Sequence, residues 1–274
     1  MSGKANLTAL GFCGADDSID PNLLGLICQS YPFVEFGVLF RPDKEGTPRY
    51  ASPAWVSKLG EVIAKTNAHT TTMRLAAHLC GTRVNEVLDG NVEFLKSLNG
   101  VFGRCQINAT AVNGVDTSNL AASVPNLLQV FEQFPDIEFI IQKNEETAPI
   151  WEGILDCCAT DDSFPSNVTF LLDESKGTGL FAGCDWSSAI PTTYPRDKKI
   201  GFAGGIGPAN VTEVLQGLTS SNNISTNAGF WIDMESSLRS SKNAEDVFDL
   251  EKCYECIRGV CALGFYGHPE FLPS

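Results

Sequence analysis

The sequence has no apolar run of about 20 residues, the length that a helix needs to cross a bilayer. Residues 1–6 also lack the apolar core of a secretory signal peptide. Basic residues are scarce, with 19 Lys and Arg against 33 Asp and Glu, so the formal net charge is −14. This charge would repel nucleic acids and anionic membranes. We therefore expect a cytoplasmic protein with no nucleic-acid or membrane partner.

The ten cysteines are scattered along 274 residues and do not form the dense pattern of a small disulfide-linked domain. We therefore expect reduced thiols. Cys253 and Cys256 resemble half of a zinc site, but no second pair follows at a suitable spacing. His78 and Cys80 lie on one face of a predicted strand, yet no third metal ligand is evident. The sequence therefore predicts no metal site.

No internal linker, low-complexity segment or break in composition divides the chain. Its 43% hydrophobic and 19% charged residues are typical of a globular protein that buries a full core. We therefore expect residues 1–274 to form one domain.

Eight apolar runs typical of buried strands recur along the chain, each followed by a polar or glycine-rich loop and a segment that can be helical. The runs are residues 7–12, 34–40, 73–79, 103–107, 137–141, 168–172, 200–203 and 229–232. Residues at their ends are 27 to 38 positions apart, close to the roughly 30 residues of a βαβ unit. This repeat predicts an α/β fold, a (β/α)₈ TIM barrel, in preference to an open doubly wound sheet.

In such a barrel the C-terminal ends of the strands meet at one mouth, where active sites lie. The most suggestive pair there is the thiol of Cys13 after strand one and the carboxylate of Asp173 after strand six. Across the barrel they can act as opposed base and acid on a bound sugar. Gly204 and Gly205 end strand seven and precede a helical pattern, which is typical of a backbone site for phosphate.

Several segments resemble motifs of the phosphoribosylanthranilate isomerase family. They are Phe12-Cys13-Gly14, Thr47-Pro48-Arg49-Tyr50-Ala51-Ser52-Pro53, Leu171-Leu172-Asp173, Gly177-Thr178-Gly179, Asp185-Trp186-Ser187, Ala203-Gly204-Gly205-Ile206-Gly207-Pro208 and, more loosely, Ile232-Asp233-Met234-Glu235-Ser236-Ser237. The resemblance spans residues 12–237 and is strongest in the second half of the chain.

The resemblance implies a (β/α)₈ barrel that converts an aminoaldose phosphate to an aminoketose phosphate by an Amadori rearrangement, without a cofactor, as in tryptophan biosynthesis. The family's general acid aligns with Asp173, and its general base aligns with Cys13. Its arginine for the anthranilate carboxylate aligns with Arg49. By the same resemblance the substrate is a phosphorylated small molecule.

The resemblance also implies which residues bind the substrate. Backbone N–H groups of Gly204 and Gly205, together with the strand-eight loop that contains Ser236, would hold the phosphate. Gln106 keeps a glutamine of the family's strand-four motif. Asp233 lies at the end of strand eight. We expect it either to contact the ligand or to serve as a structural hydrogen-bond acceptor.

Glu235 stands where the family has a serine beside the phosphate, and a carboxylate there is unfavourable unless it points away or is offset, for example by Arg239. A second hypothesis is therefore a catalytically silent barrel that binds a phosphorylated metabolite or a partner protein. A third is an aldolase that uses Lys143 to form a Schiff base. The sequence does not indicate the oligomeric state.

Overall fold

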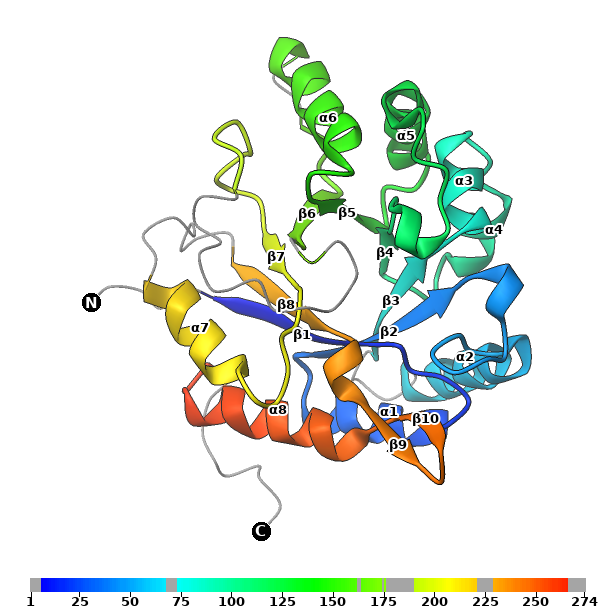
Figure 1. Cartoon of the computed structure of the whole chain (residues 1–274), viewed down its shortest axis with the longest axis vertical. Coiled ribbons are helices and arrows are strands. Elements are labelled where there is room, and N and C mark those ends of the chain that lie inside the picture. The colour runs from blue at the N-terminus through cyan, green and yellow to red at the C-terminus, as the bar shows by residue number, and fades with distance from the viewer. Residues whose placement is uncertain are drawn as a thin grey trace.

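The computed structural model describes residues 6–67, 73–161, 164–173, 175, 190–220 and 229–265. Eight parallel strands close into a barrel in the order β1 to β8, with β8 paired to β1 (Figure 1). They are β1 (Leu7–Cys13), β2 (Val34–Phe40), β3 (Arg74–Leu79), β4 (Arg104–Ile107), β5 (Glu138–Lys143), β6 (Val168–Leu172), β7 (Ile200–Phe202) and β8 (Phe230–Met234). The predicted (β/α)₈ barrel is confirmed, and the strand ends differ from the predicted runs by at most two residues.

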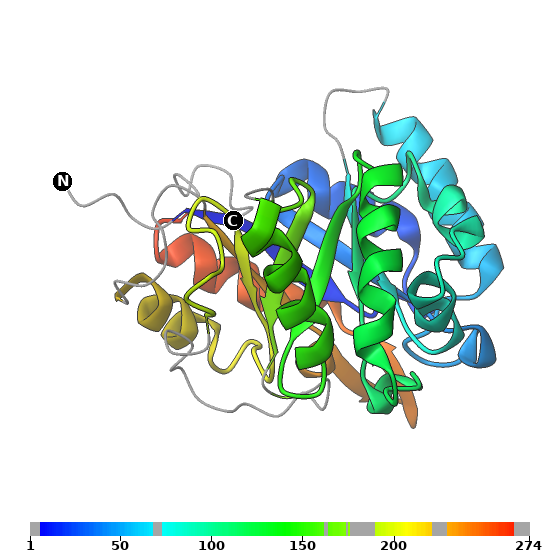
Figure 2. The ribbon, with the colours of Figure 1, turned by 90° about the horizontal axis from the view of Figure 1, so that it is seen from above.

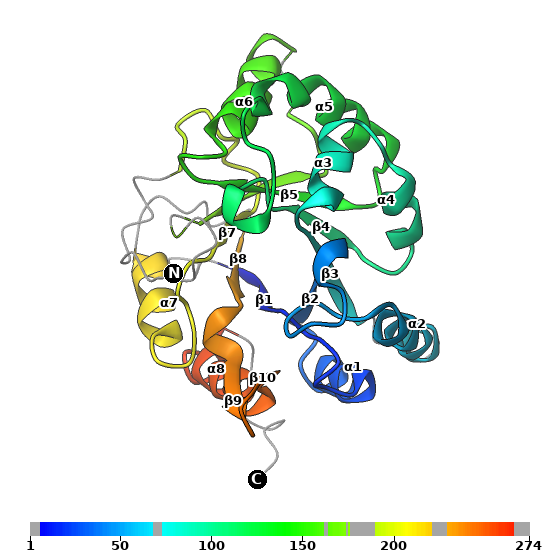
Figure 3. The ribbon, with the colours of Figure 1, turned by 45° about the vertical axis from the view of Figure 1, so that its right-hand side comes forward.

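Helices surround the barrel on its outer side (Figure 3). They are α1 (Pro21–Ser30), α2 (Pro53–Asn67), α3 (Thr82–Leu88), α4 (Glu93–Leu98), α5 (Val124–Gln133), α6 (Ala148–Asp161), α7 (Val211–Ser220) and α8 (Leu250–Ala262). In α7 the residues spaced i, i+3, i+4 and i+7 from Val211 are all buried, as their helical period requires. Helices α5 and α6 lie side by side along one flank (green in Figure 2). Among the described residues no helix is long and apolar enough to cross a membrane.

Asp20 and Asp249 begin α1 and α8, respectively, as N-caps. Each aspartate side chain accepts a hydrogen bond from the backbone N–H two residues later. Such caps satisfy one of the N–H groups that a helix leaves unpaired at its start. The two helices therefore begin at defined positions beside the strands that they cover.

The inner face of the barrel follows the two-residue alternation of its strands. Ala9, Ile140, Leu171, Ala203 and Trp231 form a separate apolar cluster, which we assign to the barrel interior. Two residues beyond Ile140, Leu171 and Trp231, the side chains of Gln142, Asp173 and Asp233 line the mouth. Gly201 lets the Trp231 ring fill the interior, because a Cβ at position 201 would lie 2.3 Å from that ring.

The N-terminal floor of the barrel is charged rather than apolar. Arg104 donates to Glu35 at 2.8 Å and to Glu138 at 3.0 Å. Its guanidinium also lies over the ring of Trp231, 4.1 Å from the centroid. A buried arginine is tolerated when its charge is paired, and here two carboxylates pair it. This network therefore closes the floor of the barrel.

A two-stranded hairpin, β9 (Arg239–Lys242) and β10 (Glu245–Phe248), separates β8 from α8 (orange in Figure 3). The sequence analysis did not predict it. Asn243 and Ala244 form its turn with φ of 54° and 66°, as a two-residue hairpin turn requires. A glycine would have signalled this turn, and alanine does not.

Substitution of Gly201 by alanine should destabilise the fold by about 1–3 kcal/mol, because the new methyl group collides with Trp231 and Leu171. Gly103→Ala is the matched control, since a Cβ there meets no atom within 4 Å. We expect that change to stay within about 0.5 kcal/mol. Urea denaturation of both variants measures the difference, and equal stabilities would contradict this account of Gly201.

Candidate functional site

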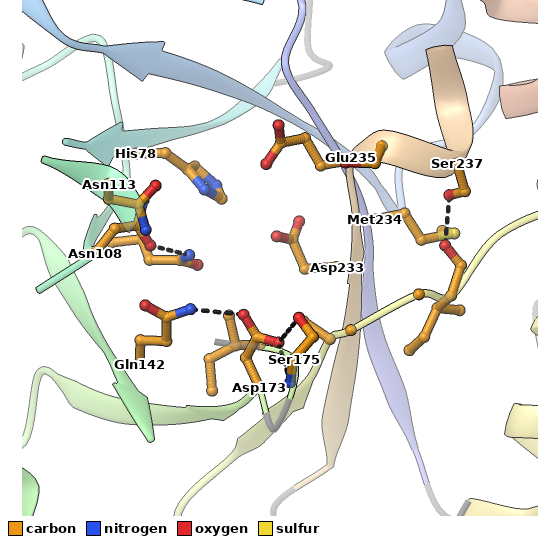
Figure 4. Close-up of a pocket in the computed structure, with 17 residues that line it drawn as sticks. His78, Asn108, Asn113, Gln142, Asp173, Ser175, Asp233, Met234, Glu235 and Ser237 are labelled. Atoms are coloured by element: carbon orange, nitrogen blue, oxygen red, sulfur yellow. Dashed lines mark hydrogen bonds between the residues drawn. The ribbon is translucent and has the colours of Figure 1, made fainter. Parts of the chain in front are cut away.

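A pocket opens at the C-terminal ends of the strands (Figure 4). Its lining comprises His78, Gln106, Asn108, Asn113, Gln142, Leu171, Asp173, Ser175, Ala203, Gly204, Gly205, Ile206, Asp233, Met234, Glu235, Ser236 and Ser237. Six of the eight site residues predicted from the sequence are among them. Cys13 and Arg49 are not in the lining, but each contacts a residue that is.

Asp173 follows β6 and is buried in the pocket wall. Its Oδ2 accepts a hydrogen bond from Gln142 Nε2 at 2.6 Å, and its Oδ1 accepts bonds from the Ser175 hydroxyl and from Ser175 N at 3.1 Å. Figure 4 shows the Gln142 and Ser175 side chains on either side of the carboxylate. These contacts fix the orientation of the carboxylate toward the pocket.

Cys13 ends β1 and contacts His78 on β3, with 3.3 Å between Sγ and Nδ1. Both side chains are buried. Burial raises the pKa of the Cys13 thiol well above its usual range, and the nearby charges of Glu235 and Asp233 raise it further. Burial also lowers the pKa of His78 to about 3. At neutral pH the pair is therefore a thiol beside a neutral imidazole, not the low-pKa thiolate expected of a simple base.

Asp233 extends inward from β8 and faces His78 and Glu235 across the pocket (Figure 4). Its carboxylate has no hydrogen-bond partner among the residues that the structure describes. Burial raises the pKa of Asp233 well above its usual range, and the charges of Glu35 and Glu235 add to this effect. Asp233 is thus an available oxygen ligand and not a satisfied structural acceptor.

Amide side chains from β4 and β5 form the wall opposite Asp233. Gln106 Nε2 donates to Asn108 Oδ1 at 2.7 Å, and Asn108 Nδ2 donates to Cys80 Sγ at 3.5 Å. The Oε1 atoms of Gln106 and Gln142 are buried and have no hydrogen-bond partner in the described structure. Because buried acceptors normally have a donor, these two oxygens are available to hydroxyl or N–H groups that enter the pocket.

The loop after β7 carries the predicted anion site. Gly204 and Gly205 have backbone φ angles of 101° and 66°, which residues other than glycine rarely adopt. Within the described residues, no acceptor is bonded to their backbone N–H groups. Asn210 fixes the loop by accepting from Gly207 N at 2.8 Å and donating to Gly205 O at 3.0 Å. The two glycine N–H groups thus remain available to an anion near the start of α7.

Arg49 lies on the rim of the pocket and is already bound to protein groups. Its guanidinium donates to Glu235 at 3.3 Å, to Ser236 Oγ at 3.1 Å and to Asp246 at 3.1 Å. Glu235 is therefore offset by Arg49 through direct contact. A substrate carboxylate would have to compete with Glu235 and Asp246 for this arginine.

Arg239 fixes the loop after β1 and lies outside the pocket lining, and its charge acts to lower the pKa of Glu235, as the sequence analysis expected. It donates to Asp16 at 2.8 Å, to Gly14 O at 2.8 Å and to Asp246 at 3.0 Å. The Arg239 and Asp16 side chains are only 3% and 4% exposed. This buried ion pair joins the β1 loop to the β9–β10 hairpin.

Ser175 and Asn113 line the pocket but were not predicted from the sequence. His78 and Gln142 were expected at the barrel mouth, His78 also as a possible metal ligand, but neither was assigned a role in the site. The alternation of inward positions along β3 and β5 is the signal that places His78 and Gln142 in the lining. Ser175 and Asn113 lie on loops, where side chains do not alternate between the two faces as they do along a strand. The Gly177-Thr178-Gly179 and Asp185-Trp186-Ser187 motifs lie outside the described residues.

No family model matches this sequence, and no curated protein matches it. Among solved structures, the chain is similar to one described as "Promiscuous Reductase LugOII Catalyzes Keto-reduction at C1 during Lugdunomycin Biosynthesis". The identity is 12%, the similarity covers 62% of this chain and 78% of the other, and the TM-score is 0.24. A similarity this weak supports no conclusion about function.

Substitution of Arg239 by leucine should destabilise the protein by about 3–5 kcal/mol, because it leaves the buried Asp16 carboxylate without its cation. The control is Asp43→Asn, which removes an ion pair whose carboxylate is 57% exposed. We expect that change to cost less than about 1 kcal/mol. Chemical denaturation compares the two variants, and equal costs would show that burial does not set the strength of the Arg239 pair.

Proposed function

We propose that the protein is a sugar-phosphate isomerase that acts as phosphoribosylanthranilate isomerases do, by an Amadori-type aldose–ketose conversion of an amino-sugar phosphate. One observation carries the proposal: Asp173, the Gly204–Gly205 turn and the unpartnered amide oxygens of Gln106 and Gln142 line the same pocket. An acid, an anion site and acceptors for hydroxyl groups are the parts that this reaction requires.

The position of the phosphate follows from the glycine turn. A Cβ on Gly204 would lie 3.1 Å from Asp173 Oδ1, so the turn passes directly beside the carboxylate. A phosphate held by the N–H groups of Gly204 and Gly205, with the Ser236 hydroxyl as a further candidate donor, would bring the sugar ring over Asp173. The close approach leaves no room for a side chain at position 204.

The acid and the base lie on different walls of the pocket in this proposal. Asp173, oriented by Gln142 and Ser175, donates a proton to the ring oxygen and so opens the sugar. The resemblance assigns removal of the C2 proton to Cys13, whose thiol contacts His78 at the pocket wall.

A barrel that binds a phosphorylated metabolite without converting it is the second candidate. The raised pKa of Cys13 favours it, because a buried thiol near Glu235 and Asp233 is a poor base. Binding would use the same glycine turn and amide oxygens. Both candidate functions therefore predict a phosphorylated ligand, and only the isomerase predicts that the ligand is converted.

The wild type should convert phosphoribosylanthranilate in an anaerobic fluorescence assay, and Asp173→Asn should lower kcat by about 10²–10⁴-fold, since the amide cannot donate the required proton. Asp116→Asn, at an exposed position away from this pocket, should match the wild type. If folded wild-type protein gives no turnover with substrate verified on a control enzyme, the isomerase proposal fails.

Substitution of Gln106 by methionine should weaken binding of ribose 5-phosphate about 5- to 30-fold, the effect of losing about 1–2 kcal/mol of hydrogen bonding. Binding of inorganic phosphate, which needs only the glycine turn, should not change. Calorimetric titration of both ligands measures the two affinities. A loss of equal size for both ligands would show that Gln106 supports the pocket as a whole and does not contact the sugar.

A further inference from the structure

Three side chains with metal-binding atoms converge at the pocket wall from three strands. Cys13 ends β1, His78 lies on β3 and Asp233 lies on β8. One sulfur, one imidazole nitrogen and one carboxylate oxygen all lie within 4.8 Å of one another. The Cys13 Sγ and His78 Nδ1 atoms are already 3.3 Å apart. Residues this far apart in sequence meet only because the barrel closes between β8 and β1.

Two glycines on the inner face create the space for this convergence. A Cβ on Gly37 would lie 2.8 Å from His78 Nε2 and 3.0 Å from Cys13 Cβ. A Cβ on Gly11 would lie 2.5 Å from an Asp233 carboxylate oxygen. Inward positions of such barrels are usually filled by bulky branched residues. At these two positions the chain instead leaves room for three polar groups to approach.

The local charges favour a cation at this point. Asp233 has no hydrogen-bond donor among the described residues, and the carboxylates of Glu235 and Asp173 line the same pocket. The charge of Arg104 acts on His78 and Asp233, but this arginine is paired with Glu35 and Glu138. The rim arginines are also paired with acids, since Arg49 binds Glu235 and Asp246 and Arg239 binds Asp16 and Asp246. A partly buried carboxylate without a donor is costly, and a bound cation removes that cost.

The geometry agrees with a tetrahedral ion. At the usual zinc–sulfur and zinc–nitrogen lengths, two ligands of one zinc ion lie about 3.5 Å apart. The Cys13–His78 separation is already close to this, and the carboxylate of Asp233 needs only a modest side-chain adjustment. A set of thiolate, imidazole and carboxylate ligands selects zinc over magnesium or calcium.

We propose that Cys13, His78 and Asp233 bind one Zn²⁺ ion with a fourth coordination position open to the pocket. His78 and Asp233 both belong to the pocket lining, so the open position faces the space where a substrate would bind. Three protein ligands with one open position are typical of catalytic rather than structural zinc sites. Water or a substrate oxygen would occupy the fourth position, and the ion would polarise it.

This site goes beyond the proposed isomerase activity and changes one role within it. A thiolate bound to zinc cannot also remove a proton from the substrate, so Cys13 is either a ligand or the base. Metal binding is measured without substrate, which keeps its test independent of turnover. Failure of the isomerase assay and failure of the metal site are therefore separate results.

The test uses the full chain, stripped of metal with EDTA and titrated with Zn²⁺ against a chromophoric chelator. We expect one Zn²⁺ per chain and a Kd below about 1 μM, within the range of protein zinc sites. Cys13→Ser, His78→Ala and the nearly isosteric Asp233→Asn should each weaken binding by at least about 100-fold, since even the loss of a residue that supports a ligand costs 10–100-fold. Cys105→Ala, which removes a buried thiol from β4, is the control and should bind as the wild type does.

Absorption spectra with Co²⁺ in place of Zn²⁺ provide a second test that does not depend on affinity. A thiolate–Co²⁺ charge-transfer band in the near ultraviolet should form in the wild type and in Cys105→Ala and be absent in Cys13→Ser. Circular dichroism confirms that each variant is folded. If Cys13→Ser does not fold, the loss of Zn²⁺ affinity in Asp233→Asn carries the test. The proposal is overturned if the wild type binds no Zn²⁺. It is equally overturned if Zn²⁺ binding persists in the variants of all three proposed ligands, which would place the ion elsewhere, for example at Cys253 and Cys256.

Discussion

The closure of eight parallel strands constrains everything else in this molecule, because every second side chain must fit inside one narrow barrel. The chain meets this constraint in layers. Arg104 and its two glutamates fill the floor, Trp231 with two alanines, an isoleucine and a leucine fills the middle, and polar groups occupy the mouth. Glycine at position 201 accommodates the tryptophan ring, and glycines at positions 11 and 37 accommodate the polar groups above it. The chemistry of the mouth thus depends on small residues in neighbouring strands.

The rim of the pocket is divided into two chemically different halves. On one side Arg49 and Arg239 join Asp16, Glu235 and Asp246, so that the loops after β1, β2 and β8 are held together by ion pairs. On the other side the lining consists of uncharged amides on β4 and β5. A ligand would therefore meet a rigid charged rim on one side and hydrogen-bonding groups on the other.

The fold could be predicted from the sequence because buried parallel strands leave apolar runs, and their regular spacing fits few topologies. The β9–β10 hairpin could not, since Ala244 stands where a glycine after Asn243 would have marked the turn. In the site, Gln106, Asp173 and Asp233 were found because strand ends converge at one mouth. The pairing of Arg49 with Glu235 and of Cys13 with His78 depends on loop conformation and on side chains from separate strands. For the same reason the raised pKa of Cys13, which depends on burial and on acids far away in sequence, could not be foreseen.

The two amide oxygens without partners have a stereochemical consequence. Gln106 is held by Asn108, and Gln142 is held by Asp173, so neither amide can turn over without breaking a hydrogen bond. Their free oxygens therefore form a fixed pair of acceptors on neighbouring strands. A polyol whose two hydroxyl groups match this pair satisfies both oxygens, whereas its epimer leaves one buried acceptor unpaired at a cost of about 1–3 kcal/mol. If the pocket binds a sugar as proposed, the wall formed by these amides would distinguish sugars that differ only in the configuration at one carbon.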